Sequence, residues 1–189
     1  MFWQKEPKNL KIIVLIIVMC VVFGTIFLIY SQKKPKKSEL PSEIEVIETE
    51  TGKIVRNRAE GYEVTIPKEW HIDATKTQFY SSLKREEVCK LTTHVSDEVK
   101  SIEEIKKDIE RTIKYEQLTV KKLEYSEIVV SGYPSLKQII ETDEWGYSIC
   151  VYIPTHRKLY RFEMAIFDLR NIKKCTQYMD NFLKTVSIK

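Results

Sequence analysis

The clearest local pattern in this chain is the stretch Gly61-Tyr62-Glu63-Val64-Thr65-Ile66-Pro67-Lys68-Glu69-Trp70. Tyr62, Val64 and Ile66 alternate with polar residues, and this period of two is typical of a β-strand with one buried face. Pro67 has no backbone N–H to donate, so the predicted strand ends there. Lys53–Asn57 lies just before the strand, and we expect the two segments to pair as a hairpin.

The same period recurs along the rest of the chain. Four further sets of alternating residues predict strands: Trp70, Ile72 and Ala74; Cys89, Leu91, Thr93 and Val95; Tyr147, Ile149, Val151 and Ile153; and Tyr160, Phe162, Met164 and Ile166. Two more strands fit between Val120 and Thr142, with Gly132-Tyr133-Pro134 as the turn between them.

Two segments change to helical spacing. Ser101 begins a Ser-x-x-Glu capping box with Glu104. The apolar residues that follow form one stripe: Ile102, Ile105, Ile109 and Ile113. Asp168 is placed to cap a C-terminal helix, whose expected buried stripe is Ile172, Cys175, Met179, Phe182 and Val186. An antiparallel sheet covered by two helices buries all these faces, so the sequence predicts an α+β fold.

Three short motifs resemble the PsbP-like family. Gly61–Trp70 is similar to the family's opening strand, which ends in Pro-x-x-Trp, and Val130–Pro134 is similar to its strand followed by Gly-x-Pro. The close of the chain, Phe182–Val186, resembles the terminal helix running into a short last strand. The resemblance spans about residues 53–189 and implies an α/β/α sandwich with a central antiparallel sheet. Trp70 and Pro134 match as scaffold positions, and no ligand residue carries over.

Family members include an extrinsic subunit of photosystem II and many bacterial secreted or membrane-anchored domains of unassigned role. The resemblance therefore implies an extrinsic domain and names no reaction or ligand.

An apolar run precedes the domain. The nineteen residues Ile12–Tyr30 carry no charge and would span roughly 28 Å as a helix, close to the thickness of a bilayer core. Lysines stand on both sides of the run. The sequence therefore predicts a tail and transmembrane helix over 1–31, a charged flexible linker over 32–51, and a PsbP-like soluble domain over 52–189.

A cleavable signal peptide is the rival interpretation of the run. Its apolar region would be shorter and would end in small residues, whereas this one ends in Ile29-Tyr30-Ser31. A lipoprotein signal would need a small residue before the modified cysteine, but Met19 precedes Cys20. We therefore expect an uncleaved single-pass anchor in the cell membrane.

The lysines nearly balance across the run, with three before it and four after it. The short basic tail is the usual signal-anchor layout and favours an extracytoplasmic domain. The cluster Lys33–Lys37 supports the opposite orientation, in which it would contact anionic headgroups of the cytoplasmic leaflet.

The formal charge of the whole chain is +4, but seven of its 31 basic residues lie in the first 38 positions. From Glu39 onward 24 basic residues face 26 acidic ones, a net charge of −2. This balance argues against nucleic acid as a partner.

Candidate catalytic and metal-binding residues are scattered. His71, His94 and His156 do not stand at metal-ligand spacing, and the sequence has no nucleophile elbow. Its five glycines form no phosphate-binding loop. Glu141, Asp143 and Glu144 precede Trp145-Gly146 at an expected hairpin tip, without the ligand pattern of a calcium loop. We name no catalytic, cofactor or metal residue.

Three cysteines fall in the domain. We expect Cys89 and Cys175 on apolar faces, and Cys150 on the opposite parity from Ile149, with Ser148 and Tyr152. Buried free thiols are the expectation, while a Cys89–Cys175 bridge across a helix–sheet contact stays open. Tyr152 has the outward parity of a recognition residue.

Three functions remain in view. The first is a membrane-anchored, non-catalytic domain outside the cytoplasm that binds another envelope protein or a ligand. The second is an enzyme whose site is assembled from scattered residues, such as Glu141 with His94 or His156. The third is a cytosol-facing membrane adaptor.

Overall fold

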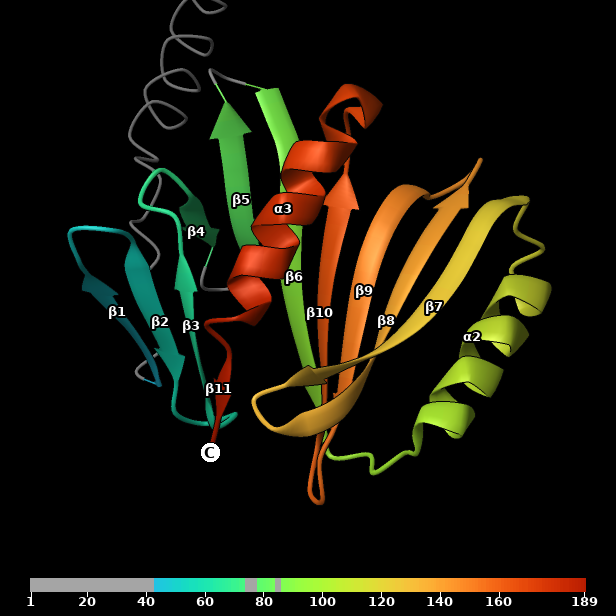
Figure 1. Ribbon diagram of the computed structural model, residues 1–189, viewed down its shortest axis with the longest axis horizontal. Coiled ribbons are helices and arrows are strands. Elements are labelled where there is room, and N and C mark those ends of the chain that lie inside the picture. Colours follow the sequence, from blue (N-terminus) through green and yellow to red (C-terminus); the bar gives the residue numbers. More distant parts are fainter. Residues whose placement is uncertain (1–42, 74–77, 84–85) are drawn as a thin grey trace, which may run out of the picture. The chain divides into compact units, whose positions relative to one another are not determined.

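The alternating segments form two antiparallel sheets in the computed structural model, which describes residues 43–73, 78–83 and 86–189 (Figure 1). Across the described residues, the small sheet has the order β1 (Ile44–Glu48), β2 (Lys53–Asn57), β3 (Tyr62–Ile66) and β11 (Ser187–Ile188). The large sheet has the order β4 (His71–Asp73), β5 (Gln78–Leu83), β6 (Glu86–Ser96), β10 (Leu159–Ile166), β9 (Gly146–Pro154), β8 (Tyr133–Thr142) and β7 (Val120–Val130).

The α+β class is confirmed, and the large antiparallel sheet lies between the two helices, but four of the described strands form a second sheet that the sequence did not predict. The chain leaves the small sheet at Pro67, where the ladder of β3 stops, and makes a turn in which the Trp70 N–H donates to the Pro67 carbonyl at 3.1 Å. It then enters the large sheet at His71. The hairpin expected between β2 and β3 is present in register, with Val55 opposite Val64.

The turn between β7 and β8 is tighter than the sequence indicated. Ser131 and Gly132 have φ values of 53° and 83°, and two positive φ values in a two-residue loop match the twist of a hairpin. Tyr133 and Pro134, which were expected in the turn, are paired residues of β8 instead. Pro134 is tolerated because β9 pairs with β8 only from Leu136 onward.

The two helices lie on opposite faces of the large sheet. On one face α3 (Ile172–Leu183) contacts β10 and β3, and the ring centroids of Phe162 and Phe182 are 5.2 Å apart. On the other face α2 (Ile102–Tyr115) lies over the alternate residues of the strands. The capping box at Ser101 and Glu104 is confirmed, with both reciprocal hydrogen bonds present.

The cap at Asp168 differs from the expectation. Its side chain accepts from the Arg170 N–H and caps the 3₁₀ turn η2 (Leu169–Asn171), and α3 follows without a side-chain cap of its own. Cys175, Met179 and Phe182 are buried as the stripe predicted. Val186 is buried too, but beyond the last residue of the helix.

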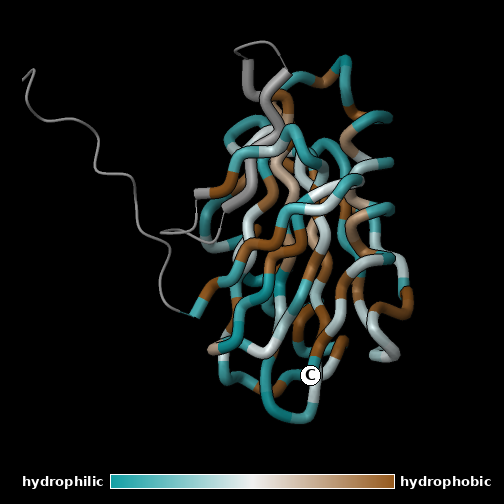
Figure 2. The backbone as a smooth tube through the Cα atoms, turned by 90° about the vertical axis from the view of Figure 1, so that its left-hand side faces the viewer, coloured by the Kyte–Doolittle hydropathy of each residue, from teal (hydrophilic) through white to brown (hydrophobic). Residues whose placement is uncertain are grey.

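The main core fills the space between α3 and the two sheets. Tyr62 of β3 makes edge-to-face contacts with Tyr160 and Phe162 of β10, and its hydroxyl lies 3.1 Å from Thr93 Oγ1 of β6. The core forms on one face of each sheet because hydrophobic and hydrophilic residues alternate along the strands, as the colouring of Figure 2 shows. Trp70 closes this core with 2% of its surface exposed and its ring edge-to-face with Tyr178.

The sheet reaches into the expected linker, where the sequence also allowed Ile44, Val46 and Ile47 to add a loose strand, and this strand is β1. Ile44 and Val46 of β1 pack against the core, and β1 pairs with the whole of β2. The apolar run Ile12–Tyr30 lies outside the described residues, and the described residues from 43 onward belong to one compact unit. Within the described part of the chain no helix is long and apolar enough to cross a membrane.

Candidate functional site

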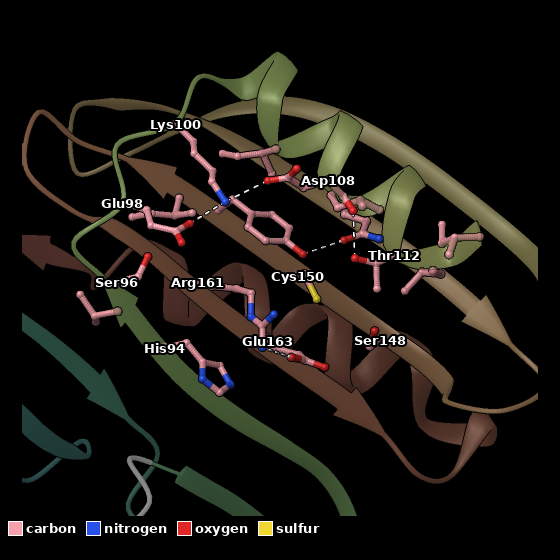
Figure 3. Close-up of a pocket in the computed structure, with 18 of the residues that line it drawn as sticks. His94, Ser96, Glu98, Lys100, Asp108, Thr112, Ser148, Cys150, Arg161 and Glu163 are labelled. Carbon is pink, nitrogen blue, oxygen red and sulfur yellow. Dashed lines mark hydrogen bonds and ion pairs between the residues drawn. The ribbon is translucent and has the colours of Figure 1, made fainter. Parts of the chain in front are cut away.

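A cavity of about 700 Å³ lies between α2 and the large sheet (Figure 3). Its floor comes from β6, β10, β9 and β8, its wall from α2, and Trp145 of the β8–β9 hairpin lies at its edge. This size is within the range of small-molecule sites. The cavity is therefore the candidate binding site.

The strand alternation explains why the floor is polar. Tyr160, Phe162 and Met164 of β10 point into the main core, so Arg161 and Glu163 must point to the other face. The antiparallel register then places His94 and Tyr152 on either side of Arg161.

A second row runs parallel to the first on the same face. Cys150 of β9 lies opposite Glu163 of β10 and opposite Gln138 of β8. The Tyr152 hydroxyl donates to Gln138 Oε1 at 3.1 Å and so joins the two rows. The floor is a grid of polar side chains held by rigid strands, which is the usual way a site gains precise geometry.

Arg161 has unused hydrogen-bonding capacity. Its Nη2 donates to Glu163 Oε2 at 3.2 Å, and the two side chains are 38% and 31% exposed. Its Nε is buried and has no hydrogen-bond partner among the described residues. A guanidinium carries five N–H donors in a fixed plane, so this side chain can donate to an oxygen ligand without giving up its bond to Glu163.

His94 lies beside this guanidinium. Burial lowers the pKa of His94, and the positive charges of Arg161 and Lys90 lower it further, while Glu163 acts in the opposite direction. The imidazole is therefore neutral at pH 7 and offers one N–H donor and one acceptor. Figure 3 shows the His94 ring and the Arg161 guanidinium next to each other on the floor.

Cys150 lies in the neighbouring row of the floor, opposite Glu163, and its environment suppresses ionisation. Burial raises the pKa of the Cys150 thiol to about 12, and the negative charge of Glu163 adds to the effect. Burial also raises the pKa of Tyr152, and the negative charge that Cys150 would carry when ionised raises it further. Both groups stay protonated at pH 7, so they serve as hydrogen-bonding and packing groups rather than as activated nucleophiles.

The helix supplies an apolar wall. Ile105 is buried at 3% exposure, and Ile109 and Ile113 line the cavity one and two turns further on. Trp145 is 56% exposed, which is unusual for so large an apolar side chain beside a cavity. The wall and the floor together make an amphipathic site.

Ion pairs fix one end of the cavity. Lys100 Nζ lies 2.5 Å from Glu98 Oε2 and 2.9 Å from Asp108 Oδ2, so the loop before α2 is tied to the helix. Hydrogen bonding to these carboxylates raises the pKa of Lys100.

The other end is fixed by the β8–β9 hairpin. Glu144 Oε2 accepts from the Thr119 N–H at 3.1 Å, and the Asp143 N–H donates to the Thr119 carbonyl at 3.2 Å. Asp143 also pairs with Lys121. The acidic residues of this tip therefore hold the connection between α2 and β7 in place.

The structure does not bring the scattered catalytic candidates together. Glu141 is on the α3 side of β8, whereas His94 faces the α2 cavity, so the sheet separates them. His156 is exposed in the β9–β10 turn, and His71 is exposed on β4. No group of three or more His, Cys, Asp or Glu residues suited to a metal is found among the described residues.

The cysteines lie where the strand parity placed them. Cys89, Cys150 and Cys175 are buried and none of them is in a disulfide with another described residue, and Cys89 and Cys175 lie in the main core. Tyr152 has the expected parity, but it lines the cavity beneath α2 rather than an open surface.

Sequence reasoning missed Arg161, Glu163 and Gln138 as site residues. The signal was present in two of the strands, because Ser148, Cys150 and Tyr152 share one parity of β9, and Arg161 and Glu163 share one parity of β10. What joins them is the pairing order of the strands, which a single sequence does not state.

The sequence matches no protein-family model and no curated protein. Among solved structures, the chain is similar to the solution structure of cyanobacterial PsbP (CyanoP) from Synechocystis sp. PCC 6803, with a TM-score of 0.48 and 10% identity, covering 84% of this chain and 99% of that one. A crystal structure from Bacteroides thetaiotaomicron VPI-5482 gives a TM-score of 0.36 and 7% identity, covering 68% of this chain and 45% of that one. Similarity of this degree shows no family, so function is inferred from the residues of this chain.

Proposed function

We propose that this chain is a PsbP-like, membrane-anchored domain outside the cytoplasm that binds a ligand or a partner protein in the cavity beneath α2 and carries out no catalysis. The single observation behind the binding role is the cavity itself, which combines an apolar helix wall with a polar floor on rigid strands. Concave sites with a few convergent polar groups are the usual places for ligands.

Two features of the floor favour binding over catalysis. Cys150 is held as a thiol, with its pKa raised to about 12. Within the described residues, no hydrogen bond connects His94 to a hydroxyl, thiol or carboxylate that it could activate. A nucleophile–base pair is what an enzyme of the hydrolase type would need.

The anchor and the orientation rest on the sequence. The uncharged run Ile12–Tyr30 is long enough to span a bilayer, and the short basic tail before it favours export of the domain. A cytosol-facing adaptor is the alternative that the cluster Lys33–Lys37 supports.

Site-specific photo-crosslinking in living cells tests the proposed site. A benzophenone amino acid replaces Trp145 at the cavity edge in the full chain, and in a matched chain it replaces Lys68, which is exposed in the turn after β3. We expect an adduct at position 145 and none at position 68. No adduct at position 145, or equal adducts at both positions, would show that the cavity is not where this protein binds.

A further inference from the structure

We propose that the cavity beneath α2 binds an amphiphile with a single anionic head group, which sits against His94 and Arg161 while the apolar body lies along α2. The inference rests on the proposed function and specifies its ligand class.

The head-group site is defined by Arg161. Its Nε is buried without a hydrogen-bond partner among the described residues, and burying an unpaired donor costs free energy. The side chain as a whole is 38% exposed, so its other N–H groups can donate charge-assisted hydrogen bonds to a carboxylate or phosphate oxygen. The guanidinium therefore offers donors and a positive charge to an anionic head group.

The sign of the head group follows from the charges on the floor. The positive charges of Arg161 and Lys90 both lower the pKa of His94. The effect of Arg161 is larger than the opposing effect of Glu163. On the Cys150 side the sign reverses, because Glu163 raises the pKa of that thiol. An anion is therefore stabilised on the β6 side of the floor, between His94 and Arg161, and not over Cys150.

The apolar body has its own surface. Ile109 and Ile113 line the cavity on α2, and Trp145 extends this surface to the opening. Burial of apolar area contributes about 25 cal/mol per Å², so a hydrocarbon body that covers the exposed indole gains binding energy. The head and the body thus lie on two different walls of one cavity, which selects for an amphiphile.

The occupant is a small molecule rather than a segment of a protein. The cavity has a volume of about 700 Å³, which is within the range of small-molecule sites, and Lys100 with Glu98 and Asp108 lines one end of it. Trp145 also lines the cavity, and its exposed indole offers a surface that a small apolar body can cover. Carboxylate and phosphate heads share the required chemistry.

Equilibrium dialysis against the full chain in lipid nanodiscs tests the proposal, with empty discs subtracted. The probes are octanoate, octyl phosphate, octan-1-ol and octylamine, which share one apolar body. We expect one or both anions to bind at least about tenfold more tightly than octan-1-ol, in keeping with one charge-assisted hydrogen bond. Octylamine is expected to bind most weakly.

Two arginine variants locate the head group. Arg161→Gln should weaken the binding of the anions about tenfold and leave octan-1-ol unchanged. Arg157→Gln is the matched control, because Arg157 is an exposed arginine in the β9–β10 turn. The melting temperature of each variant is measured alongside. If Arg161→Gln does not fold, Arg161→Lys, which keeps the charge and loses Nε, takes its place and should give a smaller loss.

The pH dependence gives an independent readout. Protonated His94 adds a positive charge beside the head group, so octanoate should bind more tightly as the pH falls through the pKa of His94. Octanoate is the probe for this measurement because octyl phosphate itself takes up a proton in the same pH range. The charged groups that act on His94 are Arg161 and Glu163 from β10 and Lys90 from its own strand. His94→Gln should remove most of this pH dependence and change the affinity little at pH 8.

Equal affinity for octan-1-ol, tighter binding of octylamine, or no binding of any probe would overturn the inference. The amphiphile inference can fail while the proposed binding function of the cavity still holds. A protein adduct at position 145 in the crosslinking experiment, together with no probe binding, would keep the cavity as the binding site and reject the amphiphile.

Discussion

Lys100 Nζ lies 2.9 Å from Asp108 Oδ2, and this contact ties the loop after β6 to the second turn of α2. α2 buries only Ile105 fully, so few apolar contacts hold the helix over the sheet. The Lys100–Asp108 pair is therefore one of the polar contacts that hold the cavity wall in place.

Removing this pair should loosen the helix without unfolding the domain. We expect Lys100→Met to speed hydrogen exchange of the α2 amides while the core strands β10 and β6 stay protected, because surface ion pairs contribute little to global stability. Lys107→Met, on the exposed side of the same helix, is the control. Unchanged exchange in α2 would mean that packing alone positions it.

Trp70 should be among the most costly residues to truncate. Its ring is 2% exposed and packs edge-to-face on Tyr178, so Trp70→Ala is expected to lower the free energy of unfolding by about 3–5 kcal/mol. Trp145→Ala should cost less than about 1 kcal/mol, because that ring is half exposed. Denaturant melts of both variants give the comparison. Similar losses would contradict the assignment of Trp145 to the cavity rather than to the core.

Alkaline pH should destabilise the fold partly through Cys150. Its folded pKa is about 12 against an ordinary value of 9.0, so the thiol is protonated in both states below pH 9 and its contribution is fully present there. Above pH 9 the unfolded chain loses this proton first, and stability falls until the folded thiol ionises as well. Cys150→Ala should show a shallower decline of the free energy of unfolding between pH 9 and pH 11. An identical decline would indicate that other groups set the alkaline limit.

The folded unit should begin before Gly52. Ile44 and Val46 pack against the core, and Arg56 bonds both Glu45 and Glu63 across three strands. A fragment of residues 40–189 should unfold cooperatively, whereas a fragment of residues 52–189 should be less stable by about 2 kcal/mol, from two half-buried aliphatic side chains. Equal stability would show that β1 is only an appendage.

The orientation of the domain is a prediction from the anchor. Protease or a membrane-impermeant lysine reagent, added to intact cells or spheroplasts, should reach the domain without lysis. Protection until the membrane is broken would reverse the orientation and favour the cytosol-facing adaptor.

Local patterns predicted the elements well because each depends on neighbours in sequence. The alternation of Tyr160, Phe162 and Met164 and the capping box at Ser101 and Glu104 are both confirmed. The division into two sheets and the place of Pro134 in β8 were missed, because pairing partners far apart in sequence determine them.

The candidate site was missed for the same reason. His94, Arg161 and Tyr152 are distant in sequence and become neighbours only through the order β6-β10-β9. The isoleucine stripe predicted that α2 would cover a sheet face. It did not indicate that a helix with one fully buried residue would leave a cavity over a polar floor.

Cysteine protection in living cells tests the central claim most directly. Thr112→Cys places a thiol on the cavity side of α2, and Lys107→Cys places one on the exposed side of the same helix. Maleimide labelling is compared between intact cells and the purified full chain, with labelling of the native cysteines subtracted. If the cavity is the working binding site, Thr112→Cys reacts markedly more slowly in cells than after purification, while Lys107→Cys reacts alike in both. Equal rates for Thr112→Cys in both settings would contradict the account.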